Sequence, residues 1–120
     1  MKSVLIADDS QVIREALRNL FEREGWKVCG DAADGQEAIT QALRSRPQVV
    51  VLDLAMPVMN GLTAARILKK LLPDARLILF SFSADLLREE ELRSAGFSAV
   101  VPKSQVQSLL EKAQGLLAAA

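Results

Sequence analysis

The feature that most constrains this chain is a short apolar run followed by an amphipathic stretch, a pattern that occurs five times in 120 residues. The clearest apolar run is Val49-Val50-Val51-Leu52, which is rich in β-branched residues. A continuous run of this kind is typical of a central strand in a parallel sheet, covered on both faces. The amphipathic stretches carry their apolar residues on one stripe, as in the first of them, which has Ile13, Leu17, Leu20 and Phe21.

The pattern predicts five strands that alternate with five helices. We expect strands at 4–7, 26–32, 49–52, 77–80 and 99–101, and helices at 11–24, 34–46, 62–72, 85–94 and 105–117. Such an alternation forms a parallel sheet with helices on both faces, and right-handed crossovers leave few strand orders. We therefore predict an α/β fold, a flavodoxin-like (βα)5 doubly wound sandwich with strand order 2-1-3-4-5, in one domain over residues 1–120. In the second helix, the inward residues should be Ala38, Ile39, Ala42 and Leu43.

Composition excludes several classes of protein. Fifteen basic and fifteen acidic residues give a net charge of zero, so we expect this chain itself to bind no nucleic acid. No apolar run approaches the length of a membrane span, and the start, where two acids directly follow a short apolar run, does not look like a signal peptide. One cysteine allows no internal disulfide, which suits a cytoplasmic protein, and the absence of histidine leaves no typical zinc site.

Polar side chains stand at the ends of four predicted strands. Two acids follow the first strand, one closes the third, a hydroxyl follows the fourth and a lysine follows the fifth. These residues are Asp8, Asp9, Asp53, Ser81 and Lys103. Ligand sites of doubly wound sheets lie beyond the carboxyl ends of the strands, and the first and third strands are neighbours there. Three carboxylates so placed repel one another unless a hard cation binds them or their pKa values rise, so we predict a Mg²⁺ site.

Each of these residues also has a plainer interpretation. The two acids at 8 and 9 can form a solvated turn with a helix cap. Asp53 can be a metal ligand only, or also a nucleophile that takes a phosphoryl group as an acyl phosphate. Lys103 can be an ordinary surface lysine, and Ser81 can cap the helix that follows it.

Taken in order along the chain, these residues resemble the receiver domain of bacterial response regulators, over essentially the whole sequence. The matching segments are Asp8-Asp9, Val50-Val51-Leu52-Asp53-Leu54-Ala55-Met56-Pro57, Asn60-Gly61, Ser81 and Val101-Pro102-Lys103-Ser104. The resemblance implies that Mg²⁺ is held by Asp9, Asp53 and the backbone carbonyl of Ala55, with Asp8 contributing through water.

The same resemblance implies a phosphorylation switch in two-component signalling. A sensor histidine kinase or a phosphotransfer protein would phosphorylate Asp53, with Ser81 as the switch hydroxyl and Lys103 as the phosphate-pairing lysine. A homodimer is a further expected assembly, and we expect no membrane partner. The chain is also similar to the subfamily whose receivers precede a helix-turn-helix DNA-binding domain, which implies transcription regulation through a domain absent from this sequence.

Three positions depart from the pattern of the family. Val100 stands where the family often has an aromatic residue, and Ser104 follows the lysine where a proline is common. Phe82 follows the switch hydroxyl, where a small residue is usual. We expect the Phe82 ring to cover the acyl phosphate, because exposing an aromatic ring forfeits about 2 kcal/mol of burial. Such a cover would slow both self-dephosphorylation and labelling by small phosphodonors.

Two other functions remain open from the sequence. One is a magnesium-dependent phosphatase that uses the same acidic residues, against which the short loops argue, since they leave little room for a substrate pocket. The other is a stand-alone or degenerate receiver that acts only by protein–protein contact, although all the site positions are filled. We favour a signalling switch that is not an enzyme beyond catalysing its own phosphoryl transfer and dephosphorylation.

Overall fold

The apolar strand at 49–52 lies at the centre of a five-stranded parallel sheet, as its sequence predicts. The computed structural model describes residues 1–118; the last two residues of the predicted domain lie outside that range. The strands are β1 Ser3–Ala7, β2 Lys27–Ala32, β3 Val49–Leu52, β4 Arg76–Ser81 and β5 Phe97–Pro102. Their order is β2-β1-β3-β4-β5, so the predicted order is confirmed.

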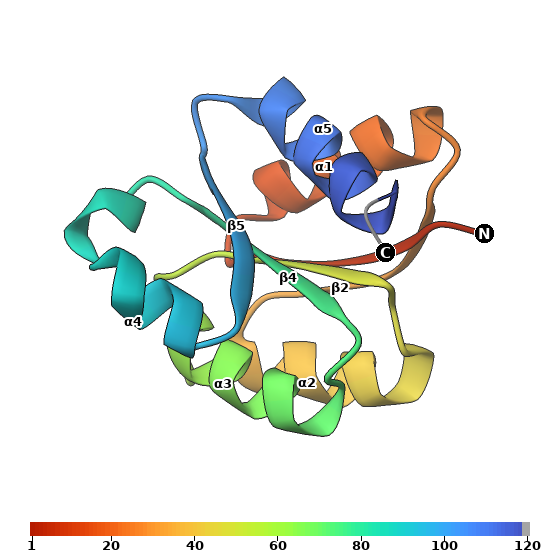
Figure 1. The fold of residues 1–120 in the computed structure, drawn as a ribbon. Coiled ribbons are helices and arrows are strands. Elements are labelled where there is room, and N and C mark those ends of the chain that lie inside the picture. Colours follow the sequence, from red (N-terminus) through yellow and green to blue (C-terminus); the bar gives the residue numbers. More distant parts are fainter. Residues whose placement is uncertain (119–120) are drawn as a thin grey trace.

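The helices cover both faces of this sheet. They are α1 Gln11–Arg23, α2 Gly35–Ser45, α3 Gly61–Leu71, α4 Glu89–Ser94 and α5 Val106–Ala118, with a 3₁₀ turn η1 at Ala84–Leu86. Figure 1 shows α1 and α5 on one face and α2, α3 and α4 on the other. Within residues 1–118, none of the helices has the length and apolar character that a membrane crossing would need.

The β3 strand joins the two layers of the core. Its alternate residues point to opposite faces, as strand geometry requires. Val50 and Leu52 pack in the cluster that includes α2 and α3, whereas Val49 and Val51 pack in the cluster that includes α1 and α5. All four are buried, which explains why the run has no polar interruption.

Side-chain caps fix the start of three helices at the same edge of the sheet. Ser10 Oγ accepts from the amide of Ile13 at the start of α1, at 3.3 Å. The carboxylate of Asp34 accepts from the amide of Glu37 at the start of α2, at 2.8 Å. The side-chain carbonyl of Asn60 accepts from the amide of Thr63 at the start of α3, at 2.9 Å. Ser10 and Asp34 lie shortly after the ends of β1 and β2, and Asn60 ends the loop that follows β3, so helix N-termini surround this edge.

Two predictions about the elements are wrong. The single helix expected at 85–94 is instead η1 followed by α4, because Leu87 and Arg88 are extended between them. The acids 89–91 favour a helix that begins at Glu89, and Glu91 accepts from the amide of Arg88 at 3.3 Å. In α2, Leu43 is 42% exposed rather than inward, because the three inward residues before it already fill the contact with the sheet.

Candidate functional site

The side chains predicted from the strand ends meet at the carboxyl edge of the sheet. Asp8 and Asp53 leave the neighbouring strands β1 and β3 at the same level, and the amide of Asp53 donates to the carbonyl of Ala7 at 2.9 Å. Ser81 is the last residue of β4, and Lys103 directly follows β5, where its amide faces the Ser81 carbonyl at 3.3 Å. The parallel register therefore brings residues that are far apart in sequence to one place.

Three carboxylates and one ammonium form the centre of this site. Asp8 and Asp53 are 2% and 6% exposed, whereas Asp9 is open to solvent. Ligand oxygens of the three acids all lie within 4.8 Å of one another. Lys103 Nζ lies 2.6 Å from Oδ2 of Asp8 and 3.1 Å from Oδ2 of Asp53, so one cation bridges two buried anions. The plain interpretation of Lys103 as a surface lysine is wrong, because its side chain is 6% exposed.

Burial and charge set the ionisation of this pair. Burial raises the pKa of Asp53 and the nearby charge of Asp8 raises it further, while the hydrogen bond from Lys103 only partly opposes them. For Lys103, burial alone would lower the pKa, but the bonds to Asp8 and Asp53 outweigh it, so its pKa stands above the usual value. The cluster therefore keeps its lysine charged and retains an excess of negative charge that a further cation would relieve.

The residues present fit a magnesium ion. A pocket of about 320 Å³ opens over the cluster, and its lining includes Asp8, Asp9, Asp53, Ala55 and Lys103. All three carboxylates offer the hard oxygen donors that Mg²⁺ prefers, and the exposed Asp9 leaves room for the waters that Mg²⁺ retains. The cluster therefore suits a hydrated divalent cation rather than a closed structural metal site.

The Ser81 hydroxyl lies in the wall of the same pocket and is 2% exposed. Its oxygen accepts from the amide of Ser83 at 3.1 Å, which closes a short turn. Ser81 therefore does not cap the following helix, which was the plainer interpretation of this residue. Because the oxygen is used as an acceptor there, the hydroxyl proton can be donated to an anion in the pocket. Ser81 thus links the pocket directly to the segment that leads into η1.

The backbone behind Asp53 is held by the start of α3. The amide of Gly61 donates to the carbonyl of Leu54 at 2.9 Å. A Cβ atom at position 61 would overlap the carbonyl oxygen of Asp53, so only glycine allows this approach. The Asn60-Gly61 pair noted in the sequence therefore has two distinct tasks: Asn60 caps α3, and Gly61 lets the helix pack against Asp53.

The expectation that Phe82 covers the site is wrong for this structure. The side chain lines the pocket, but Phe82 is 75% exposed. Its ring centroid lies 5.3 Å from Lys103 Nζ, close enough for a cation–π contact. This contact and the attachment of Phe82 beside the buried Ser81 hold the ring at the rim, where most of it faces solvent.

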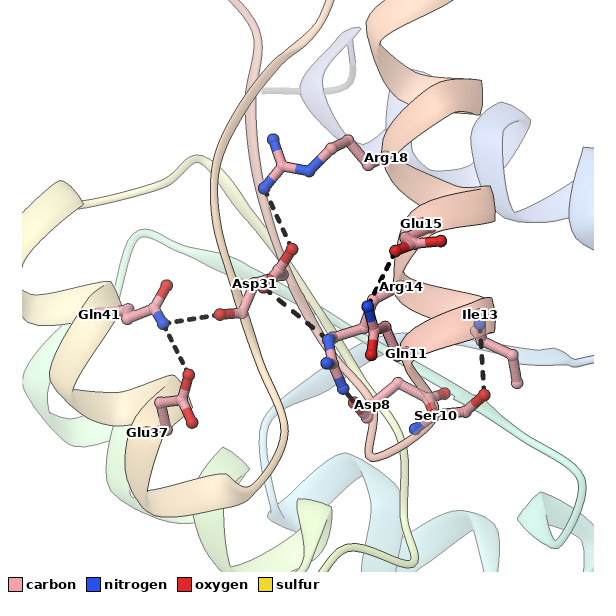
Figure 2. A network of polar contacts seen from close by, with 10 residues as sticks. All are labelled: Asp8, Ser10, Gln11, Ile13, Arg14, Glu15, Arg18, Asp31, Glu37 and Gln41. Carbon is pink, nitrogen blue, oxygen red and sulfur yellow. Dashed lines mark hydrogen bonds and ion pairs between the residues drawn. The ribbon is translucent and has the colours of Figure 1, made fainter.

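Two residues of the site's surroundings were not identified from the sequence. Arg14 donates from Nη1 to the backbone carbonyl of Asp8 at 2.7 Å, and its Nε lies 3.8 Å from Oδ1 of Asp31 (Figure 2). Arg18 contacts the other oxygen of Asp31 at 3.1 Å. The sequence signal that could have identified them is their spacing: two arginines four residues apart lie on one helix face. That face lies opposite Asp31, an acid near the end of β2.

Comparison with known proteins gives a consistent match. A family model described as the response regulator receiver domain matches residues 4–114. Among curated proteins, the chain is 40% identical over 104 residues to a protein-glutamate methylesterase/protein-glutamine glutaminase of Hahella chejuensis. That match covers 85% of this chain but only 30% of the relative, so the chain spans less than a third of that protein's length.

Solved structures of the same shape come from different proteins. A two-component response regulator of the LuxR family from Aurantimonas is 31% identical with a TM-score of 0.87, covering 98% of this chain and 85% of that one. CheY in a CheX–CheY–BeF₃–Mg²⁺ complex from Borrelia burgdorferi is 26% identical with a TM-score of 0.86, covering 97% and 89%. The three relatives carry three different names, so what they share with this chain is the fold of this domain.

Proposed function

Because this chain belongs to the response regulator receiver domain family, the signalling domains of two-component systems, we propose that it accepts a phosphoryl group on Asp53. The observation that carries the proposal is the arrangement at the carboxyl edge of the sheet. Asp53 and Asp8 share the ammonium of Lys103, at 3.1 and 2.6 Å, with Asp9 beside them and Ser81 in the same pocket. Receiver domains interact with histidine kinases or phosphotransfer proteins, and we propose such a protein as the donor.

Transfer uses Asp53 as a nucleophile. A carboxylate oxygen of Asp53 attacks the phosphorus of a donor phosphohistidine, the P–N bond breaks, and its electron pair stays on the imidazole nitrogen. Receiver domains bind Mg²⁺ at an acidic pocket, and here the ion would be held by Asp9, Asp53 and the Ala55 carbonyl, with Asp8 acting through water. When bound, Mg²⁺ neutralises charge on the transferring group.

The other residues of the pocket hold the product. Lys103, already charged and directed at Asp53, pairs with a phosphate oxygen once the acyl phosphate has formed. Ser81 turns inward to donate its hydroxyl to a second phosphate oxygen, and this movement carries its oxygen away from the amide of Ser83. This exchange would pull on the segment that follows β4 and so pass the phosphorylation signal to the surface.

The output is a separate part of the proposal. We propose regulation of transcription through a helix-turn-helix domain outside this chain, supported by the resemblance of segments 79–83 and 102–104 to that subfamily. The second candidate is action by protein–protein contact, which the exposed side chains of Phe82 and Leu86, at 75% and 79%, favour. A phosphatase is less well supported, because the pocket of about 320 Å³ is small and shallow.

Phosphate labelling tests the nucleophile. Wild type incubated with radiolabelled acetyl phosphate and Mg²⁺ should take up a base-labile phosphate, whereas Asp53→Asn should take up none while keeping its circular dichroism spectrum. Asp74→Asn is the matched control, since Asp74 is an exposed acid outside the pocket and should label normally. Equal labelling of wild type and Asp53→Asn would refute the assignment.

A further inference from the structure

Asp9 depends on the backbone for its position. Within residues 1–118, its side chain makes no hydrogen bond or ion pair, and it is exposed. Asp8, by contrast, is held by Lys103 and by the amide of Ser10, which donates to Asp8 Oδ1 at 2.9 Å. Whatever orients the peptide unit that joins Asp8 to Asp9 therefore sets the point from which the Asp9 side chain projects.

That peptide unit is held by Arg14. The carbonyl oxygen of Asp8 belongs to it and accepts from Nη1 of Arg14 at 2.7 Å. Because a peptide unit is planar, fixing its oxygen also fixes the direction in which the chain leaves towards the Cα of Asp9. On the other side, the amide of Asp8 donates to the carbonyl of Ala32 at the end of β2, at 2.9 Å.

Arg14 is itself held in place from two sides. Its side chain is 16% exposed and rises from the first turns of α1. Asp31 forms an ion pair with Arg14 through one carboxylate oxygen, at 3.8 Å, and with Arg18 through the other, at 3.1 Å. The backbone carbonyl of Asp31 accepts from Gln41 on α2 at 2.6 Å, so the acid is tied to both neighbouring helices (Figure 2).

We propose that Arg14 is a positioning residue for the magnesium site, acting through the Asp8–Asp9 peptide unit rather than by contact with the ion or the phosphate. The inference rests on the proposed function. The positive charge of Arg14 makes the inference testable, because an arginine beside a cation site opposes cation binding by electrostatics alone. A net favourable effect of Arg14 on Mg²⁺ affinity can therefore come only from geometry.

Magnesium titration by calorimetry separates the two effects. Arg14→Gln should bind Mg²⁺ about tenfold more weakly than wild type, the low end of losses seen when a group that orients metal ligands is removed. Arg18→Gln is the matched control: it also removes one positive charge and a contact with Asp31, but Arg18 does not touch Asp8. Its Mg²⁺ affinity should stay close to wild type or rise slightly.

A second readout observes the peptide unit directly. In ¹⁵N–¹H spectra without metal, Arg14→Gln should move the amide signal of Asp9, which belongs to the peptide unit in question, and Arg18→Gln should leave it in place. If Arg14→Gln does not fold, Arg14→Lys carries the test, because it keeps the charge while losing the planar fork that reaches two partners. A loss of Mg²⁺ affinity in that variant supports positioning, and wild-type affinity overturns it.

Mg²⁺ binding by wild type tests the proposed function, and Mg²⁺ binding by Arg14→Gln tests the positioning role separately. If wild type binds no Mg²⁺ and gains no thermal stability from it, the proposed function fails. If wild type binds Mg²⁺ and Arg14→Gln binds it as tightly or more tightly, Arg14 acts only as a nearby charge and the positioning role is overturned.

Discussion

The burial of Asp53 makes its charge costly until a cation arrives. Its pKa is raised, first by burial and then by the charge of Asp8, which means that folding disfavours the ionised form. At neutral pH the carboxylate is ionised in the unfolded chain, so the folded state bears this cost. The site is thus held ready for an ion, at the expense of stability without one.

From this we predict that Asp53→Asn is more stable than wild type in EDTA, because a neutral amide of the same shape avoids the cost of the buried charge. Millimolar Mg²⁺ should then raise the melting temperature of wild type and much less that of the variant; binding at 100 times the dissociation constant adds about 2.7 kcal/mol. Thermal melts of both proteins with EDTA and with Mg²⁺ measure this. A lower stability of the variant in EDTA would mean that the ion pair with Lys103 outweighs burial.

The exposed ring of Phe82 gives a second prediction at the scale of one residue. Phe82→Ala removes little buried surface, so the expected loss of stability is only that of an exposed cation–π contact, about 0.5–1 kcal/mol. Self-dephosphorylation should stay close to the wild-type rate, while transfer from a protein donor should slow if Phe82 contacts that donor. Paired rate measurements at matched Mg²⁺ decide it, and faster dephosphorylation in the variant would restore the role of a cover.

At the scale of elements, the start of α3 is fixed by its contact with the end of β3. Gly61→Ala should destabilise the protein by about 1–3 kcal/mol, as overpacking does, and weaken Mg²⁺ binding, because the added methyl overlaps the carbonyl of Asp53. Gly115→Ala is the matched control, since a Cβ there meets nothing within 4 Å. At this exposed position of α5 it should stabilise by up to about 1 kcal/mol. Urea unfolding of both variants measures the difference, and equal effects would contradict it.

Elements with a strong local signal could be predicted from the sequence. The apolar run of β3 and the polar residues at strand ends are local features, and parallel topology then gathers them. The break between η1 and α4 was missed because its amphipathic pattern continues through the extended Leu87 and Arg88. Arg14 was missed because its partner, the Asp8 carbonyl, is a backbone group that no residue type reveals.

At the scale of the whole molecule, the pocket and the surface are connected through the loop after β4. Ser81 Oγ holds the amide of Ser83, and η1 follows at once, with Leu86 79% exposed. Leu87 packs partly against the core, so the segment is anchored on one side and open to solvent on the other. Such a segment has few bonds to lose and can adopt a second arrangement when Ser81 changes its partner.

A phosphoryl mimic tests whether the signal travels this way. Beryllofluoride with Mg²⁺, which stands in for the phosphoryl group on Asp53, should draw the Ser81 hydroxyl inward and release the amide of Ser83. In ¹⁵N–¹H spectra, wild type should therefore show shifts at residues 83–87 and at Val100 as well as in the pocket. With a valine at position 100, 37% exposed, instead of an aromatic ring, the change there should be small. Ser81→Ala should still bind the mimic but confine the shifts to the pocket, because the bond to Ser83 is already absent. Wild-type shifts confined to the pocket would refute the propagated switch and leave only the local chemistry of Asp53.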